Sequence, residues 1–185
     1  MAARMNPSEY RRRAKVINFG ILYGLSAYGL SRQLQISRPE AQRFIDSYFE
    51  RYRGVRRWLD ATLGQALENG GVRTLFGRFR PIPELKSRDK NTRNFGERIA
   101  TNSPIQGTAA DLIKLAMVEL HKELDRRALR SRLILQVHDE LVLECPENEV
   151  EPIKVLLREV MEGVHALRVP LRVEVGSALN WKDLK

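Results

Sequence analysis

Two apolar runs separated by only a few polar residues constrain the fold of this 185-residue chain most strongly. Leu133–Leu135 and Leu141–Leu143 flank the sequence QVHDE, and their composition predicts strands over about 132–137 and 140–145. A connection this short joins two strands as an antiparallel hairpin. The tip of the hairpin carries three adjacent ionisable residues, His138, Asp139 and Glu140. An ordinary polar turn and a ligand site both explain this tip, because aspartate is common in turns.

The rest of the chain reads as helices followed by short strands. Helical periodicity fills the first 70 residues. After Gly70 and Gly71 the pattern changes, and the flanks of Gly77 predict a short hairpin or an irregular ribbon. Pro104 is expected to separate two helices, because proline disfavours helical geometry at Ser103. The expected helices are 7–24, 26–34, one from 37, 53–68, 87–101, 105–126 and one ending near 163, with a last strand at 169–175. This element order predicts an α+β fold.

Composition excludes several classes of protein. No apolar run approaches the roughly 18 residues of a membrane span, and the N-terminus lacks the apolar core of a secretory signal. A cytoplasmic location is therefore expected. The single cysteine, Cys145, excludes an internal disulfide and a multi-cysteine zinc site. It is expected to be a small apolar residue at the end of a strand.

The excess positive charge lies entirely in the first part of the chain. Residues 1–80 hold 15 Lys and Arg against 6 Asp and Glu, whereas residues 81–185 hold 17 of each. A one-sided distribution of this kind is typical of a face that binds a polyanion. A solvated basic surface without a partner explains the same counts.

Four residues spaced by four form a stripe along the first predicted helix: Arg11, Lys15, Phe19 and Tyr23. Cations occupy one end of the stripe and aromatic rings the other, which suits the triphosphate and the base of a nucleotide. The alternative is a helix whose aromatic residues are core and whose basic residues are solvated. Gly20 and Gly24 favour the ligand, because glycine inside a helix costs about 1 kcal/mol relative to alanine. Close approach by another group would explain both glycines.

Asp139 stands where a strand meets a tight turn, so its carboxylate can project from the rim of the sheet. Carboxylate and phosphate oxygens are the ligands that Mg²⁺ prefers. Glu140 could assist, and His138 could hydrogen-bond a phosphate. One carboxylate cluster is incomplete for two-metal phosphoryl chemistry, which usually requires a second carboxylate from elsewhere.

A third group of polar residues, Arg98, Asn102 and Gln106, is also spaced by four, around Pro104. Arginine, asparagine and glutamine are well suited to contacts with base edges and sugars. Capping by Asn102 together with ordinary surface polarity is the alternative explanation.

Together these stretches resemble the polymerase domain of family A DNA polymerases, the bacterial DNA polymerase I type. RRRAKVINFGILYG is similar to motif B of that family, the fingers helix that receives the incoming nucleotide. QVHDELVLE is similar to motif C, a palm hairpin with a metal-binding aspartate. NSPIQGTAADLIKLAM and VPLRVEVGSALNW match the family in order and spacing. The resemblance extends from about residue 7 to 182.

For the first part of the chain, the resemblance implies a fingers subdomain over residues 1–85. Arg11 and Lys15 would contact the triphosphate of the incoming deoxynucleotide. Phe19 would pack on its sugar and base, and Tyr23 would stack near the templating base.

For residues 86–185 the resemblance implies the C-terminal part of a palm subdomain. Asp139 would bind the catalytic Mg²⁺ with Glu140 in support, and His138 would lie near the primer terminus or the β-phosphate. With Lys15, these three form the expected catalytic set. Five residues are implied to contact primer–template DNA: Arg78, Arg80, Arg98, Asn102 and Gln106.

The chain departs from the family pattern in one respect. A strand of the type DYSQIELR, motif A, supplies the other metal-binding aspartate in the family, and nothing like it occurs here. The Mg²⁺ site is therefore expected to be incomplete. The chain resembles about the last fifth of a family member, and by itself it is expected to be inactive. A catalytically silent DNA- or nucleotide-binding module is the alternative function.

The partners implied are primer–template DNA, deoxynucleoside triphosphates and the missing N-terminal part of the polymerase, with no membrane, at the nucleoid. Motif A would pair in the same sheet as the 132–145 hairpin. Its absence is expected to leave an open sheet edge, which favours self-association.

Overall fold

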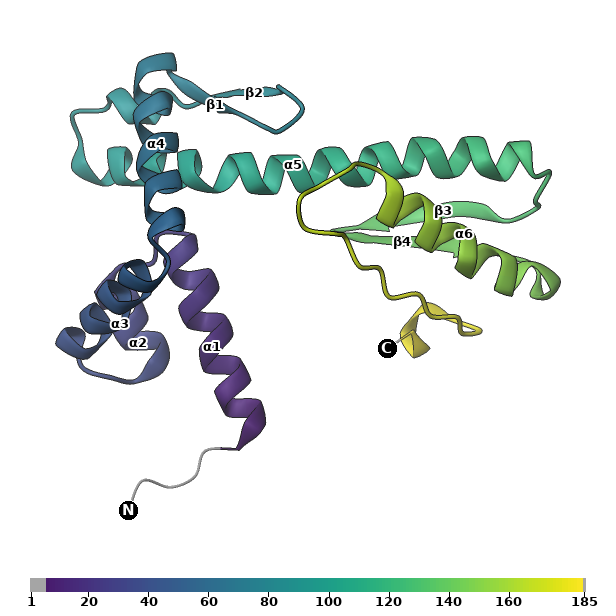
Figure 1. The fold of residues 1–185 in the computed structure, drawn as a ribbon, viewed down its shortest axis with the longest axis horizontal. Coiled ribbons are helices and arrows are strands. Elements are labelled where there is room, and N and C mark those ends of the chain that lie inside the picture. Colours follow the sequence, from purple (N-terminus) through teal and green to yellow (C-terminus); the bar gives the residue numbers. More distant parts are fainter. Residues whose placement is uncertain (1–5, 185) are drawn as a thin grey trace. The chain divides into compact units, whose positions relative to one another are not determined.

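The computed structural model describes residues 6–184, and Figure 1 shows their fold. Two compact units divide the chain, residues 1–105 and 106–185. Helix α5 (Lys90–Arg126) runs through the boundary between them. The mixture of helices with two small antiparallel sheets confirms the predicted α+β class. Among the described residues, no helix has the length and apolar character needed to cross a bilayer.

The first unit consists mainly of helices and one short hairpin. Its elements are α1 (Pro7–Leu22), α2 (Ala27–Leu34), α3 (Arg38–Arg51), α4 (Arg53–Asn69), β1 (Gly71–Arg73), β2 (Phe79–Pro81), the short 3-10 helix η1 (Pro83–Lys86) and the start of α5. Side-chain caps explain three helix starts, because Asn6, Ser26 and Ser37 each accept a hydrogen bond from a backbone N–H in the first turn. Helix α4 ends at Gly70, whose φ of 71° is the left-handed conformation that glycine adopts without strain.

Two apolar clusters stabilise the first unit. One packs α2 against α3 through Ala27, Leu30, Leu34 and Ala41. The other joins α4 to the β1–β2 hairpin, η1 and α5, and its members are Ala66, Val72, Ile82, Leu85 and Ala100. The second cluster therefore holds the hairpin in position beside α4.

The second unit pairs a hairpin with two helices. Its elements are the rest of α5, β3 (Arg132–Val137), β4 (Glu140–Glu144), η2 (Glu147–Glu149), α6 (Val150–Gly163) and η3 (Trp181–Asp183). Strands β3 and β4 are antiparallel, and their bounds agree with the predicted hairpin to within one residue. A register shift between Leu133 and Leu135 marks a β-bulge.

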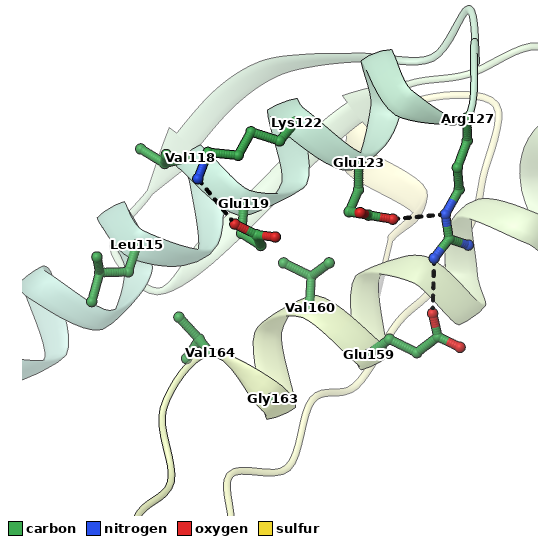
Figure 2. Close-up of a pocket in the computed structure, with 10 residues that line it drawn as sticks. All are labelled: Leu115, Val118, Glu119, Lys122, Glu123, Arg127, Glu159, Val160, Gly163 and Val164. Atoms are coloured by element: carbon green, nitrogen blue, oxygen red, sulfur yellow. Dashed lines mark hydrogen bonds and ion pairs between the residues drawn. The ribbon is translucent and has the colours of Figure 1, made fainter.

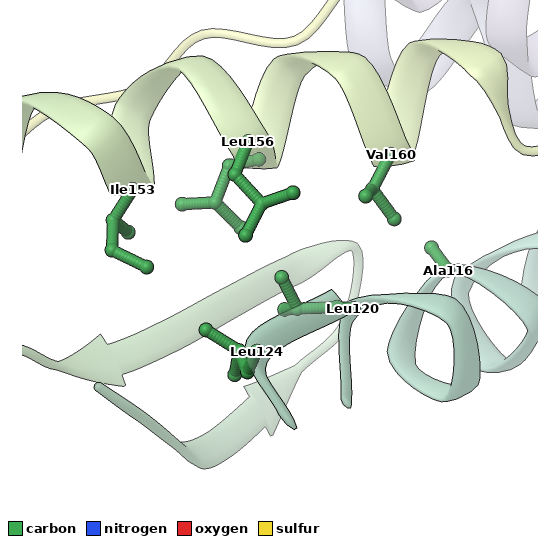
Figure 3. Close-up of a cluster of buried hydrophobic side chains, with 7 residues drawn as sticks. Ala116, Leu120, Leu124, Ile153, Leu156 and Val160 are labelled. Atoms are coloured by element: carbon green, nitrogen blue, oxygen red, sulfur yellow. The ribbon is translucent and has the colours of Figure 1, made fainter. Parts of the chain in front are cut away.

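The core of the second unit lies between α5 and α6, where side chains from the two helices point toward one another (Figure 3). Leu120 of α5 and Leu156 of α6 are both fully buried. Partly buried residues of the hairpin pack on this core, among them Leu133 and Leu143. Cys145 packs there as well, which agrees with its expected role as a small apolar residue.

The predicted helix break at Pro104 is wrong, because α5 is continuous from Lys90 to Arg126. Packing of the turn before the proline explains the difference: Ala100 is fully buried and Ser103 is 5% exposed. The hydroxyl of Ser103 also donates a hydrogen bond to the carbonyl of Ile99, at 2.6 Å. Tertiary burial of this turn outweighs the local preference of the residue before proline.

The predicted strand at 169–175 is also wrong, since this segment has no regular secondary structure. A strand needs a neighbouring strand to receive its backbone hydrogen bonds, and none of residues 6–184 supplies one here. The N–H of Val173 instead donates to a carboxylate oxygen of Glu162, at 2.9 Å. Val175 still packs on the core of the unit.

A buried carboxylate joins the start of α6 to the start of β3. Glu149 is 8% exposed, and its carboxylate accepts hydrogen bonds from the N–H of Arg130 and from both the N–H and the hydroxyl of Ser131. The hydrogen bond from the Ser131 hydroxyl, followed by that from the Arg130 N–H, lowers the pKa of Glu149 below its ordinary value of 4.5. The folded chain therefore stabilises the ionised carboxylate of Glu149.

This lowered pKa predicts a pH-dependent contribution to stability. The contribution is fully present above pH 4.5, the ordinary pKa, and is lost as the pH falls toward the lower pKa of the folded chain. We expect the melting temperature of Glu149→Gln to fall less between pH 6 and pH 3 than that of the unsubstituted chain, as measured by circular dichroism. Glu147→Gln, an exposed position in the same turn, is the control. Parallel pH profiles for all three proteins would contradict this account.

Candidate functional site

The N-terminal part of α1 separates its cations into paired and unpaired groups. Glu9 hydrogen-bonds to Arg12 and Arg13, which lowers the pKa of Glu9 to about 2. Within residues 6–184, neither Arg11 nor Lys15 forms an ion pair, and both side chains are exposed. Arg11 and Lys15, the two cations of the predicted stripe, are therefore available to bind an anion.

The aromatic end of the stripe forms a stacked pair. The ring centroids of Phe19 and Tyr23 lie 6.2 Å apart, and the ring planes differ by 11°. Phe19 is 53% exposed, so the predicted alternative that this ring belongs to the core does not hold for it. Tyr23 is half-buried at the C-cap of α1, just beyond the helix end at Leu22.

A cavity of about 420 Å³ lies beside this aromatic pair. Phe19 and Tyr23 line it together with Arg98 of α5, so the structure brings one member of the third predicted group to the stripe. Four further lining residues were not predicted from the sequence as part of this site: Val16, Leu25, Ser26 and Gln33. Helical spacing on α2 could have indicated Gln33, but no local pattern links it to α1.

The structure explains both glycines without a ligand, so they no longer favour one as the sequence indicated. A Cβ on Gly20 would lie 2.8 Å from a methyl carbon of Leu25. Gly24 lies outside the helix, with a φ of 77°, and a Cβ there would lie 3.3 Å from the Arg98 side chain. The predicted helix end at 24 is therefore two residues too late, and Gly24 serves the turn between α1 and α2.

The tip of the β3–β4 hairpin is a two-residue turn formed by His138 and Asp139, because Val137 pairs with Glu140. His138 has a φ of 53°, which is uncommon for a residue with a side chain. The side-chain amide of Gln136 donates to the His138 carbonyl and supports this conformation. The side chains of all three ionisable residues at the tip are exposed.

The oxygen donors at this tip fit magnesium chemistry, but their number does not make a complete site. Asp139 and Glu140 supply carboxylates of the kind that Mg²⁺ prefers. In the described part of the chain, no group of three or more His, Cys, Asp or Glu side chains could hold a metal ion. The tip thus places two adjacent carboxylates, those of Asp139 and Glu140, at the surface of the hairpin.

The predicted group around Pro104 lies on α5, but the two units divide it. Arg98 and Asn102 belong to the first unit, and Gln106 begins the second. The guanidinium of Arg98 lies 5.8 Å from the ring centroid of Phe95. The buried Oδ1 of Asn102 has no hydrogen-bond partner within residues 6–184, so Asn102 is not simply a satisfied cap.

Two of the three arginines predicted to contact DNA lie on the β1–β2 hairpin and are exposed. Arg78 lies in the turn, where its N–H donates to the hydroxyl of Thr74. Arg80 lies in β2, and its guanidinium donates to the hydroxyl of Ser103 at 3.0 Å. Arg80 is thereby held against α5.

A cavity of about 470 Å³ between α5 and α6 contains none of the predicted site residues (Figure 2). Its charged side chains form ion pairs with one another: Lys122 with Glu119, and Arg127 with both Glu123 and Glu159. The acid–base spacing along α5 could have indicated the pairs within that helix, but not the pair with Glu159 of α6. Because its charges are paired, this cavity resembles a structural surface more than a site of chemistry.

The family described as DNA polymerase family A matches residues 2–183. DNA polymerase I of Caldicellulosiruptor bescii is 51% identical over 177 residues, which is 96% of this chain and 21% of that protein. DNA polymerase I of Bacillus subtilis is 50% identical over 178 residues, or 96% of this chain and 20% of that protein. The chain thus spans about a fifth of the length of these relatives.

A solved structure is also similar to this chain. It is the POL domain of Pol1 from M. smegmatis in complex with DNA primer-template and dNTP. The TM-score is 0.89 and the sequence identity is 46%, over 94% of this chain and 30% of that one.

Proposed function

Because the chain belongs to DNA polymerase family A, we propose that it provides the nucleotide-binding helix and one metal-binding carboxylate of a DNA-directed DNA polymerase. The reaction is template-directed addition of deoxynucleoside monophosphates to a primer 3′ end. The observation that carries this proposal is the stripe on α1. Arg11 and Lys15 are exposed and without ion pairs in the described residues, and a stacked aromatic pair follows them.

In this proposal α1 binds the incoming deoxynucleoside triphosphate along its length. Arg11 and Lys15 neutralise phosphate charge, and charge-assisted hydrogen bonds to phosphate are among the strongest available to a side chain. Phe19 packs on the sugar and base, and Tyr23 stacks near the templating base. Arg98 lines the same cavity as these rings, from which it can reach the nascent pair.

The hairpin tip supplies the acidic part of the site. Asp139 would hold Mg²⁺ with Glu140 in support, and the ion when bound would stabilise charge on the transferring phosphate. His138 would lie near the primer terminus or the β-phosphate. The second carboxylate would come from the other four-fifths of such a polymerase, since two-metal chemistry requires more than one carboxylate ligand.

The test is a chimera in which this chain replaces the segment that it matches in the Bacillus subtilis polymerase. The chimera is expected to extend a primer on a template with Mg²⁺, whereas the isolated chain is expected to give no measurable extension. A folded chimera that binds DNA but does not extend it would favour the alternative, a catalytically silent DNA- or nucleotide-binding module.

The basic first part of the chain is proposed to bind primer–template DNA through phosphate contacts. Such contacts release counterions, so the logarithm of the affinity falls linearly with the logarithm of salt concentration. Arg78→Ala is expected to reduce the magnitude of this slope by about one, because one phosphate contact is lost. Fluorescence anisotropy with a labelled duplex measures the slope. Arg172→Ala, an exposed arginine in the second unit, serves as the control, and an equal change in both variants would contradict the assignment.

Both edges of the β3–β4 hairpin are open in the described part of the chain, and Ile134 of β3 is 58% exposed. We propose that this sheet pairs with the remaining palm of a polymerase, and that the isolated chain self-associates through it. Sedimentation velocity that finds only monomer at high concentration would contradict the second statement. The proposed location is cytoplasmic, at the nucleoid.

A further inference from the structure

A second cavity of the first unit, about 400 Å³, shares no lining residue with the cavity beside Phe19 and Tyr23. Helix α4, the β1–β2 hairpin and Pro104 of α5 line it. We call it the Trp58–Phe79 cavity, after the aromatic residue that each of two walls contributes. A volume of this size suits a small molecule or a single base.

The aromatic walls of this cavity are partly exposed to solvent. Trp58 on α4 is 38% exposed and Phe79 on β2 is 41% exposed. Leaving these ring surfaces in water forgoes the free energy that burying them would provide. A flat partner that covers the rings would recover it, and nucleobases are such partners.

Local structure holds the hairpin wall in place. The guanidinium of Arg73 lies 5.0 Å from the ring centroid of Phe79 and donates to the carbonyl of Gly77 at 2.8 Å. A Cβ on Gly71 would overlap the carbonyl oxygen of Arg80 and would lie 2.7 Å from the tip of the Phe79 ring. The glycine thus lets the ring lie against the backbone, and Arg73 adds a second planar surface on which a base can stack.

The α4 wall adds polar groups that match the edges of a base. Thr62, Gln65 and Asn69 line the cavity next to Trp58. Their hydroxyl and amide groups both donate and accept hydrogen bonds, as the edges of bases do. Asn69 donates to the Gln65 carbonyl at 2.8 Å, which fixes the direction of its amide.

The charge around the cavity favours a polyanionic strand. All of the excess positive charge of the chain lies within residues 1–80, which include both aromatic walls. The hairpin itself carries three arginines: Arg73, Arg78 and Arg80. Stacking surfaces in a basic setting are the usual arrangement for binding single strands without strict sequence preference.

We propose that the Trp58–Phe79 cavity binds an unpaired base of single-stranded DNA, outside the proposed polymerase site. The base stacks on Trp58 and on the hairpin wall formed by Phe79 and Arg73. Gln65 and Asn69 contact its edge, and nearby arginines contact the flanking phosphates. The cavity would therefore hold a single-stranded segment of DNA that the polymerase site does not contact.

Tryptophan fluorescence tests the proposal directly, because the chain contains only two tryptophans. In a Trp181→Phe background, emission comes from Trp58 alone. A 12-nucleotide oligo(dT) is expected to quench this emission, since a stacked base quenches the indole. An abasic deoxyribose-phosphate oligomer of the same length and charge is expected to bind without quenching.

Phe79→Leu is the diagnostic variant, because leucine keeps an apolar side chain over Gly71 and removes the flat ring. It is expected to weaken oligo(dT) binding by about 5- to 100-fold and to leave binding of the abasic oligomer unchanged. Phe44→Leu is the matched control, since Phe44 is 42% exposed on α3 and does not line the cavity. Circular dichroism establishes that each variant is folded.

Equal affinity for the two oligomers without quenching would overturn the proposal, as would equal effects of Phe79→Leu and Phe44→Leu. The quenching experiment leaves the cavity residues unchanged, so it still tests the proposal if Phe79→Leu does not fold. Neither the fluorescence quenching nor the oligomer affinities of the variants depend on primer extension by the chimera. Failure of the polymerase function and failure of this site are therefore distinguishable.

Discussion

Replacing Asp139 by asparagine in the chimera with the Bacillus subtilis polymerase is expected to lower the rate of primer extension by more than about 100-fold. Asparagine keeps the size of the side chain and removes the charge that Mg²⁺ requires. Loss of a residue that merely supports a metal ligand typically costs about 10- to 100-fold in activity or metal affinity, so loss of the ligand should cost more. Single-turnover extension with saturating deoxynucleotide measures the effect.

The control for this experiment is Asp125→Asn, the same substitution on an aspartate of α5 whose side chain is 73% exposed. It is expected to leave the rate within a factor of two. Duplex affinity should be nearly unchanged in both variants, since Asp139 acts on the chemical step. If the Asp139→Asn chimera extends the primer at the control rate, Asp139 is not a ligand of the proposed metal site.

Replacing Leu156 by alanine is expected to lower the free energy of unfolding by about 2–5 kcal/mol, the range for leucine-to-alanine changes in a core. Leu156 is fully buried on α6 and belongs to the cluster that also contains the fully buried Leu120 of α5. The substitution removes apolar contacts and leaves a cavity that a close-packed core fills only in part. Urea unfolding followed by helical circular dichroism measures the change.

Val155→Ala is the comparison, because Val155 is the neighbouring residue on α6 and is 51% exposed. Its truncation should change the free energy of unfolding by less than about 0.5 kcal/mol. Equal destabilisation by the two substitutions would mean that the α5–α6 core in Figure 3 does not stabilise this unit as described.

Local sequence patterns predicted much of this fold. Two apolar runs and a short turn placed the β3–β4 hairpin to within one residue, because register in a tight hairpin depends on adjacent residues. Spacing by four placed Arg11, Lys15 and Phe19 on one side of α1 for the same reason. The assignment of these residues to nucleotide and metal binding stays a prediction, as does the division into fingers and palm at residue 85.

Features that depend on distant residues were not predictable in this way. The helix continues through Pro104 because Ala100 and Ser103 are buried by tertiary contacts. The segment 169–175 reads as a strand, yet a strand forms only where another strand is adjacent. Arg98 reaches the cavity beside Phe19 through a fold in which α5 passes α1, which no local spacing encodes.

The sequence by itself determined the elements whose causes are local: the capped helices, the two-residue hairpin tip with Asp139, and the stripe of cations followed by aromatic rings. It also determined the family, since ordered motifs extend over nearly the whole chain. Only the tertiary structure decided which rings stay exposed and which elements share a cavity. The reason is physical: exposure and shared cavities depend on residues far apart in the chain, whereas turn geometry, helical spacing and ion pairs within one helix depend on neighbours.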